Sequence, residues 1–343
     1  MTRIDRLLFS IAAAGGLAIA APADAQTELT VSLWIPPTHM LARDVIMPWA
    51  ADVEKATSGR VKFKLLPKSV ANPIQTFDAI RDGLADVGFI SHSYTPQRFQ
   101  LTRIGVLPFS GDNSVSNSVA LWRIYDKYLT GPNEHRGVHV LTLYTHGPGV
   151  MWNTKKAVTK IDDLAGLKFR VGGGMAADVG TAIGATVLVK PAPESYELLS
   201  SGVVDGVFFP GESIVSFKLE KLVKYATQFP GGFYSDSHAV IMNEAKWNAL
   251  PAADKEAITK LSGEAFARRA GQAWDKNAEA GWNVAKANNV QVTRADAAFV
   301  AAVKDRTAKF EQEWLNDAKA KGIDGPKVLA EYRAELKKLE SGK

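Results

Sequence analysis

The stretch FDAIRDGLADVGFI (Phe77–Ile90) aligns without a gap to YELLSSGVVDGVFF (Tyr196–Phe209). Each stretch predicts a helix, then a glycine suited to the left-handed residue after a helix end, then an aspartate and an apolar strand. One alternative is that two unrelated helix–glycine–strand turns resemble each other by chance. The recurrence of the whole pattern after 119 residues instead indicates two lobes of similar plan.

Strand and helix patterns alternate along the chain around these two stretches. Such alternation is typical of α/β lobes with mostly parallel strands. From Glu244 onward the chain is Ala/Lys/Glu-rich and helical in pattern, with an interruption at Asn288–Val292. Strands are expected at Leu29–Trp34, Arg60–Leu65, Asp86–Ile90, Val138–Tyr144, Leu167–Val171, Thr186–Val189, Val204–Phe209, Leu222–Thr227 and Ala239–Met242. Helices are expected at Leu41–Ala56, with a kink or break at Pro48, and at Ile74–Leu84, Val115–Tyr128, Ala176–Ile183 and Glu194–Ser201.

The composition is that of an ordinary globular protein. The 343 residues are 46% hydrophobic and include 41 Lys+Arg and 36 Asp+Glu, which gives a formal net charge of +5. The length suggests about two domains, and the composition excludes disorder, a collagen-like repeat and a coiled coil. The chain has no cysteine, so a disulfide framework, a cysteine nucleophile and a thiolate metal site are excluded. Basic and acidic residues alternate, so we expect no nucleic-acid partner.

The first 25 residues have the pattern of a secretory signal peptide. Arg3 and Arg6 precede the apolar run Leu7–Ala21, and Ala23–Ala25 (ADA) is a small-residue cleavage site, so the mature chain is expected to begin at Gln26. The alternative is a membrane anchor, but the run is shorter than the roughly 18–20 residues that a span needs. We therefore expect export to the periplasm, where ATP and nicotinamide cofactors are not expected.

The sequence contains no recognisable catalytic or metal-binding motif. The six histidines include no His-Glu-x-x-His pair, and there is neither a Walker loop nor a Gly-x-Ser-x-Gly elbow. Gly172–Ala177 (GGGMAA) loosely matches a dinucleotide-binding turn, but no acidic residue follows where a ribose would need it. We interpret this turn as one whose backbone approaches a bound anion at a helix N-terminus. No cofactor, metal ion or catalytic residue is assigned.

Arg170 lies near the end of the apolar strand Leu167–Val171. A guanidinium there is costly unless it is paired, and its planar fork can hold a carboxylate through two charge-assisted hydrogen bonds. An internal salt bridge or an exposed strand end would explain Arg170 equally well. Ligands of open α/β sheets bind beyond the C-terminal ends of the strands, so the segments that follow the strands are expected to meet in one cleft. The residues placed in this cleft beside Arg170 are His39, Ser91, His92 and Ser93, and the aromatic residues Trp34, Trp152, Phe208, Phe209, Phe233 and Tyr234.

Several stretches along the mature chain are together similar to a known family. They are WIPPTH (Trp34–His39), DAIRDGLADVGF (Asp78–Phe89), KIDDLAGLKFR (Lys160–Arg170), SGVVDG (Ser201–Gly206) and NEAKWNALP (Asn243–Pro251). In this order and spacing they resemble the extracytoplasmic solute-binding subunit of tripartite ATP-independent periplasmic (TRAP) transporters, the DctP family. The resemblance implies an α/β, type II-like periplasmic binding protein with two lobes, a cleft between them and a long helix spanning both. It also implies closure on an organic acid, binding of the acid's carboxylate by Arg170, and delivery to a pair of membrane permease subunits.

The sequence departs from the family pattern at three places, and each departure removes a polar side chain. A second arginine of many members is absent from GPGVMWN (Gly147–Asn153), where Gly149 stands near its place. Phe208-Phe209-Pro210 replaces a stretch that often carries an asparagine, and a polar residue near Phe233 is also replaced. These changes argue against a C4-dicarboxylate or a sialic acid. They favour a monocarboxylate with an apolar or aromatic body, or a small 2-oxo or hydroxy acid.

The expected organisation assigns residues 26–148 and about 238–285 to lobe I, and residues 149–237 and about 286–343 to lobe II. A monomer is expected, as for most family members, and the alternative is a dimer through the tail Phe310–Lys343. Two other functions stay open from the residues. One is a periplasmic enzyme acting on a carboxylate with His39 or His92 as general base, and the other is an ABC-type solute receptor of similar shape.

Overall fold

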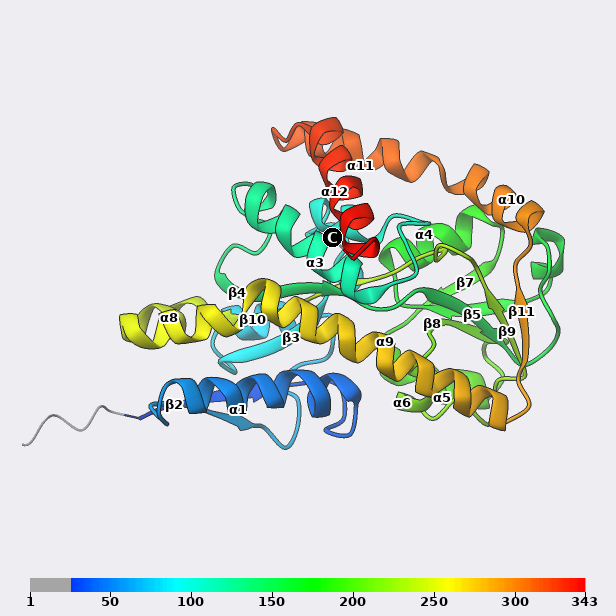
Figure 1. The fold of residues 1–343 in the computed structure, drawn as a ribbon. Coiled ribbons are helices and arrows are strands. Elements are labelled where there is room, and N and C mark those ends of the chain that lie inside the picture. Colours follow the sequence, from blue (N-terminus) through cyan, green and yellow to red (C-terminus); the bar gives the residue numbers. More distant parts are fainter. Residues whose placement is uncertain (1–25, 343) are drawn as a thin grey trace, which may run out of the picture.

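A computed structural model of the chain describes residues 26–342, so the expected signal peptide lies outside the described residues. Two β-sheets lie next to each other with helices packed around them (Figure 1). We call the half built on the five-stranded sheet lobe I and the half built on the six-stranded sheet lobe II. Among residues 26–342, no helix combines the length and the apolar character that a bilayer crossing requires.

The sheet of lobe I has the strand order β2-β1-β3-β10-β4. Strand β1 pairs in parallel with β2 and β3, whereas β10 runs antiparallel to β3 and β4. The sequence predicted a strand in each of these five places, with ends shifted by two residues at most. The strands are β1 (Thr27–Ser32), β2 (Val61–Leu65), β3 (Val87–Ser91), β4 (Val138–Thr145) and β10 (Ser237–Asn243).

The sheet of lobe II has the strand order β11-β9-β5-β8-β6-β7. Strand β6 pairs in parallel with β7 and β8, β5 runs antiparallel to β8 and β9, and β11 lies parallel to β9 at the edge. The strands are β5 (Gly149–Asn153), β6 (Lys168–Val171), β7 (Thr186–Val189), β8 (Gly206–Pro210), β9 (Tyr225–Gln228) and β11 (Gln291–Arg294).

Both sheets are mixed rather than mostly parallel, because the chain crosses between them. Strand β4 of lobe I is followed directly by β5 of lobe II, and β9 of lobe II is followed by β10 of lobe I. The two crossings are residues 146–148 and 229–236. A strand that arrives from the other lobe enters its new sheet antiparallel to its neighbours, which explains the orientation of β5 and β10.

The repeated helix–glycine–aspartate–strand segment takes the same place in both lobes. Helix α2 (Thr76–Arg81) leads to β3, and helix α5 (Ser195–Ser200) leads to β8. After these helices, Gly83 and Gly202 have φ angles of +80° and +73°, in the left-handed region that favours glycine. The pattern read from the sequence therefore marks two equivalent turns.

The aspartates of the repeat also have matching roles. Asp86 Oδ2 accepts a hydrogen bond of 2.7 Å from the backbone N–H of Thr30 in β1. Asp205 Oδ2 accepts one of 2.9 Å from the backbone N–H of Lys168 in β6. Each carboxylate thus ties its own strand to the neighbouring parallel strand, which supports a common plan for the two lobes.

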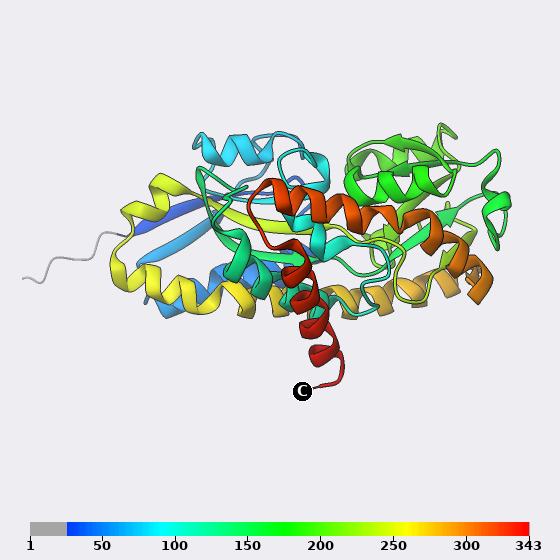
Figure 2. The ribbon, with the colours of Figure 1, turned by 90° about the horizontal axis from the view of Figure 1, so that it is seen from above.

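Helix α9 (Gly263–Ala287) runs along both lobes, as Figures 1 and 2 show. It packs on α3 (Ser114–Ile124) and β4 of lobe I and on α6 (Ser213–Ser216) of lobe II. Its Trp282 ring stacks on that of Trp152 in β5, with ring centres 4.9 Å apart. This is the long helix spanning both lobes that the family resemblance implied.

The other helices surround the two sheets. The expected helix at 41–56 begins as a π-helical turn (Leu41–Ile46) and continues as α1 (Met47–Ala56), with Pro48 in the first turn of α1, where its missing N–H is not needed. The remaining α-helices are α4 (Gly174–Ala182), α7 (Glu244–Ala249), α8 (Ala252–Leu261), α10 (Ala297–Thr307), α11 (Lys309–Ala320) and α12 (Gly325–Glu340).

The C-terminal region differs from the expectation in two respects. Strand β11 forms where the sequence indicated only an interruption of helix. The sequence did not predict this strand because three of its four residues are exposed and no apolar alternation marks it. Residues 286–343 were expected in lobe II, but α12 packs on α3 of lobe I. There Arg123 Nη1 donates a hydrogen bond of 2.6 Å to Glu335 Oε2. A solvent-facing amphipathic helix carries no sequence signal for the lobe that it will cover.

Candidate functional site

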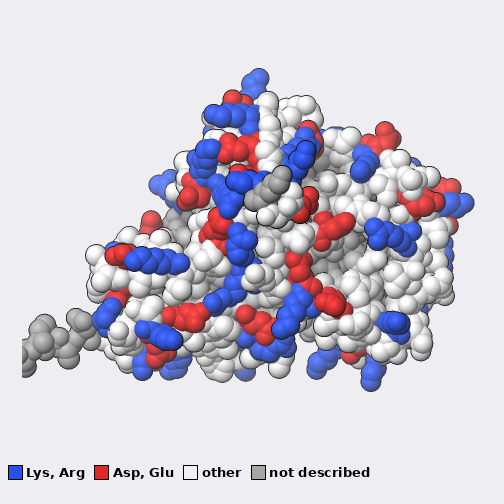
Figure 3. Space-filling model, in the orientation of Figure 1, with Lys and Arg blue, Asp and Glu red and all other residues white. Residues whose placement is uncertain are grey.

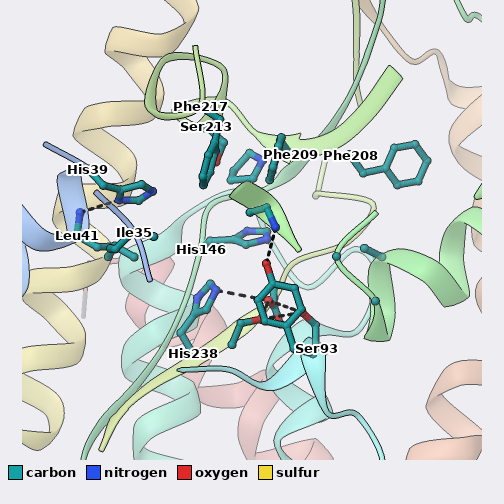
Figure 4. A pocket seen from close by; sticks show the side chains of 18 of the residues that line it. Ile35, His39, Leu41, Ser93, His146, Phe208, Phe209, Ser213, Phe217 and His238 are labelled. Atoms are coloured by element: carbon teal, nitrogen blue, oxygen red, sulfur yellow. Dashed lines mark hydrogen bonds and ion pairs between the residues drawn. The ribbon is translucent and has the colours of Figure 1, made fainter. Parts of the chain in front are cut away.

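A cavity lies where the two lobes meet, beyond the C-terminal ends of β1, β3, β6 and β8. This is the position at which open α/β sheets bind ligands. Figure 4 shows part of its wall, with side chains from both lobes pointing toward one another. The structure brings eight predicted site residues together here: Trp34, His39, Ser91, Ser93, Arg170, Phe208, Phe209 and Tyr234.

Arg170, at the end of β6, is 1% exposed. Its Nε–H donates a hydrogen bond of 2.8 Å to the backbone oxygen of Lys190, and its guanidinium carbon lies 4.6 Å from the centre of the Phe209 ring. No carboxylate among residues 26–342 comes within 4.0 Å of the guanidinium. Burial lowers the pKa of Arg170, and the nearby Tyr94 and Tyr234 partly oppose this effect. A guanidinium keeps its charge in proteins, so Arg170 is a buried cation that has no ion-pair partner among the described residues.

Basic side chains on the molecular surface have acidic neighbours, unlike Arg170 in this site. On the face seen in Figure 3, Lys and Arg side chains lie among Asp and Glu side chains. A surface arginine therefore has acidic neighbours and water at hand, whereas Arg170 has the neutral groups of the cavity wall around it. The internal salt bridge that the sequence left open as an explanation is not formed by the described residues.

Aromatic rings form much of the remaining wall. The Trp34 ring stacks on Phe89 at 4.9 Å between centres, and its Nε1–H donates a hydrogen bond of 2.9 Å to the backbone oxygen of Phe89. On the other side, Phe209 stacks on Phe217 with ring centres 5.2 Å apart and planes 8° apart. Flat apolar surfaces on both sides of the cavity suit a planar apolar ligand body.

The lobes touch beside the cavity through the glycine turn Gly172–Gly174. Gly173 has a φ angle of +107°, and a Cβ atom there would lie 2.6 Å from the backbone oxygen of Ser93 in lobe I. Only glycine allows this close approach. The turn was expected to approach a bound anion, and the structure adds a contact with Ser93 of the other lobe that the pattern did not predict.

Asp236 brings a negative charge to the cavity wall. Ser91 Oγ and Ser93 Oγ both donate hydrogen bonds to its Oδ2, the second at 2.8 Å, and His238 Nε2 lies 3.4 Å from the same atom. Burial raises the pKa of Asp236, while His146 and the serine hydrogen bonds act in the opposite direction. Figure 4 shows His146, His238 and Ser93 around this part of the cavity.

The three histidines of the wall are held neutral. Burial is the main cause that lowers the pKa of His39 to about 3, of His146 to about 4 and of His238 to about 3. Such weakly basic imidazoles act at neutral pH as hydrogen-bonding groups and are poor proton acceptors. Among residues 26–342, no three His, Asp or Glu side chains are grouped so that they could hold a metal ion.

Four residues predicted for the site lie outside the cavity wall. His92 is buried in lobe I, where its Nε2 lies 3.0 Å from Nε2 of His135 and its Nδ1 lies 2.9 Å from Ser237 Oγ. His92 was predicted to lie in the cleft, but it does not line this cavity, because the residue after β3 turns its side chain into the core. The others, Gly149, Trp152 and Phe233, lie behind the wall.

These last three residues support the wall from behind. A Cβ atom at Gly149 would lie 1.9 Å from the Tyr234 ring, so the glycine leaves room for that ring. The Trp152 Nε1–H donates a hydrogen bond of 3.1 Å to the backbone oxygen of Phe209. The Phe233 ring packs edge-on against Phe208, with centres 5.1 Å apart. They shape the cavity without lining it.

Sequence reasoning missed several residues of the wall: His146, Phe217, Asp236, His238 and Trp274. Three of them lie in or next to the two crossings, and Trp274 comes from the middle of α9. For the residues near the second crossing, the polar run Ser-Asp-Ser-His at 235–238 was the available signal. Trp274 carried no signal, because one tryptophan on a long amphipathic helix normally faces the core.

Comparison with known proteins agrees with the resemblance seen in the sequence. Residues 32–317 match the family described as bacterial extracellular solute-binding protein, family 7 (DctP). A relative from Comamonas testosteroni, named outer membrane transporter protein TsaT, is 32% identical over 331 residues, which cover 96% of this chain and 97% of the relative.

Two solved structures share the whole fold. A TRAP periplasmic solute-binding protein from Bordetella bronchiseptica, crystallised with (R)-mandelate and (S)-mandelate, is 55% identical, with a TM-score of 0.89 over 91% of this chain and 99% of that one. A TRAP solute-binding protein from Rhodoferax ferrireducens T118, in complex with copurified benzoate, is 27% identical, with a TM-score of 0.84 over 92% of this chain and 99% of that one.

Proposed function

Since the chain belongs to the bacterial extracellular solute-binding proteins of family 7, the DctP family of TRAP transporters, we propose that it binds an aromatic monocarboxylate through Arg170. The observation that carries the proposal is the buried guanidinium of Arg170, which has no carboxylate partner among the described residues and lines a cavity between aromatic rings. A buried cation is stable only with a partner, and a bound carboxylate supplies one through two charge-assisted hydrogen bonds.

The wall composition supports a single carboxylate on the ligand. Among the described residues of the wall, Arg170 is the one arginine, and no lysine is present. The three histidines are neutral, and Gly149 stands where many family members carry a second arginine. A second carboxylate on the ligand would therefore lose its water shell without gaining a cation.

The apolar part of the wall supports an aromatic body. The rings of Trp34, Phe209 and Phe217 offer flat surfaces, and burying a phenyl group against them is favourable by about 25 cal/mol per Å² of apolar surface. Two structural relatives carry mandelate and benzoate, which are aromatic monocarboxylates. These relatives support the same class of ligand for this chain.

Binding follows from closure of the lobes. The acid enters between lobe I (residues 26–148 and about 238–285) and lobe II (residues 149–237 and β11 with α10), and the crossings at 146–148 and 229–236 act as the hinge. Closure removes water from the Arg170–carboxylate pair, which strengthens it, and brings Gly173 against Ser93. The closed shape then presents the loaded protein to the permease.

The wider setting follows from the family and the leader sequence. The chain acts as an exported receptor, cleaved after Ala25, that hands its acid to TRAP permease subunits and works as a monomer without chemical change of the ligand. The pKa of His39, lowered to about 3 by burial, makes it a weak base and argues against general-base catalysis in the cavity. Recovery of intact ligand by mass spectrometry after long incubation tests this point.

Calorimetric titration with benzoate and mandelate tests the binding proposal. Replacement Arg170→Ala is expected to weaken binding by about 3–5 kcal/mol, because the ligand carboxylate is then buried without a partner. Arg170→Lys keeps the charge but loses the planar fork, so its affinity is expected to lie between those of the wild type and of Arg170→Ala. Arg136→Ala, at an exposed arginine, is the control and should bind as the wild type does. Unchanged binding by Arg170→Ala would contradict the proposal.

A further inference from the structure

The cavity wall contains a second charged side chain that carboxylate binding by Arg170 does not use. Asp236 lies in the crossing between β9 and β10 and is the one acidic residue among the described residues of the wall. Its side chain keeps 16% of its surface uncovered while it lines the cavity. The carboxylate of Asp236 repels a carboxylate ligand in the same cavity, unless the ligand places a hydrogen-bond donor in front of Asp236.

The contacts that Asp236 receives from side chains all go to one oxygen. Ser91 and Ser93 donate their hydroxyl hydrogens to Oδ2, and His238 Nε2 faces the same atom at 3.4 Å. The backbone N–H of Ser237 also faces the carboxylate. Oδ1 receives none of the three side-chain contacts. Because a carboxylate can accept about four hydrogen bonds, Asp236 keeps capacity for a donor from the ligand.

Two neighbouring polar atoms of the wall have no hydrogen-bond partner among the described residues. They are His238 Nδ1 and Trp274 Nε1, and both are buried. The two rings are nearly parallel, with planes 9° apart and centres 6.2 Å apart. A ring nitrogen that faces a carboxylate is expected to carry the ring hydrogen, which would leave Nδ1 of His238 as an acceptor, whereas Trp274 Nε1–H can only donate. Buried polar groups are normally hydrogen-bonded, so this side of the cavity lacks one polar partner.

We propose that Asp236, His238 and Trp274 form a subsite for a hydroxyl group on the aromatic acid. The proposal rests on the proposed function, because Arg170 holds the carboxylate of the same ligand. A hydroxyl group donates one hydrogen bond and accepts others, which suits a side of the cavity that offers both an acceptor and a donor. An acid without a hydroxyl group would place apolar atoms against the carboxylate of Asp236 and leave its remaining hydrogen-bonding capacity unused.

Calorimetric titration with two pairs of acids tests the subsite, because the members of each pair differ by one hydroxyl group. Mandelate against phenylacetate reports a hydroxyl group beside the carboxylate, and 3-hydroxybenzoate against benzoate reports one on the ring. In at least one pair the hydroxylated acid is expected to bind about ten- to hundredfold more tightly, the range for a hydrogen bond to a charged group. Equal affinities within both pairs would overturn the proposal without any variant being made.

Replacement Asp236→Ala then tests the residue. This variant is expected to bind both members of the discriminating pair with the same affinity, and the control Asp162→Ala, at an exposed aspartate, should keep the wild-type ratio. A preserved ratio in Asp236→Ala assigns the selectivity elsewhere and rejects the subsite. Failure of the proposed function has a different signature, because then none of the four acids binds, or Arg170→Ala binds them as the wild type does.

Discussion

The hydroxyl oxygen of Tyr94 in lobe I accepts a hydrogen bond of 2.9 Å from the backbone N–H of Ala192 in lobe II. The same hydroxyl group lies beside the guanidinium of Arg170, which it helps to keep charged. Tyr94 therefore joins the two lobes next to the group proposed to bind the ligand. Because its two partners belong to different lobes, we expect separation of the lobes to break this contact and thereby to link closure to the state of the site.

Replacement Tyr94→Phe removes this link and keeps the ring. The loss of one hydrogen bond that forms on closure is expected to weaken binding of benzoate or mandelate about three- to tenfold. Small-angle scattering should show a larger radius of gyration for the unliganded variant than for the wild type. Tyr196→Phe makes the same change at a tyrosine that is 49% exposed and should have neither effect. An affinity equal to that of the wild type would show that the Tyr94–Ala192 bond does not contribute to closure.

Replacement Gly173→Ala tests the close approach of the lobes. The new Cβ atom would lie 2.6 Å from the backbone oxygen of Ser93, so the lobes cannot close fully, and ligand affinity is expected to fall at least tenfold. Gly166→Ala is a matched control, because Gly166 has a φ angle of +80° but no atom within 4 Å of its Cβ position. Both variants carry backbone strain, on the order of 1–3 kcal/mol, which is visible as a lower melting temperature. Equal affinity losses in the two variants would assign the effect to strain rather than to the contact.

The buried pair of His92 and His135 makes the protein sensitive to acid. Burial lowers the pKa of His135 to about 3, with a smaller contribution from Arg98, and burial together with His135 lowers the pKa of His92 well below 6.5. Because these pKa values are below those of the unfolded chain, the stabilisation is complete above about pH 6.5 and is lost as the pH falls. Each histidine then costs about 1.4 kcal/mol per pH unit.

Replacement His135→Gln should flatten this dependence. Urea unfolding of the wild type and of the variant between pH 8 and pH 5 is expected to give free energies that converge, or cross, toward the acid side. Parallel curves over that range would contradict the assignment of acid sensitivity to the histidine pair.

Glu212 is expected to act in the opposite direction. It is 2% exposed, and burial raises its pKa from 4.5 to about 7, although Ser213 and Ser216 donate hydrogen bonds to it and favour its charged form. Because the pKa is raised in the folded state, the stabilisation is complete below about pH 4.5 and is lost as the pH rises to about 7. Replacement Glu212→Gln removes this loss. The free energy of unfolding of the variant, relative to that of the wild type, should therefore rise by on the order of 3 kcal/mol between pH 4.5 and pH 8.

Chemical denaturation at several pH values measures this difference. Glu197→Gln, at an exposed glutamate, serves as the control and should show a constant difference from the wild type. A pH-independent difference for Glu212→Gln would mean that Glu212 is charged throughout the range.

Local patterns account for most of the elements and for one half of the site. The glycines after α2 and α5 and the aspartates that follow them were readable because each acts within its own turn or on an adjacent strand. Arg170 was readable because a charged residue at the end of an apolar strand is unusual. The sequence did not predict strand β11 or the packing of α12 on α3, because exposed edge strands and amphipathic helices carry no signal for their partners.

The amino-acid sequence by itself determined the two-lobed α/β plan, the long helix α9 and the placement of a cation at the end of β6, because periodicity, turn chemistry and family motifs are properties of short segments. Only the tertiary structure decided that Asp236, His238 and Trp274 face this cation across one cavity while His92 does not. The reason is physical: these side chains come from one crossing, from strand β10 and from the spanning helix α9, and they meet only after both sheets have formed and the lobes have packed against each other.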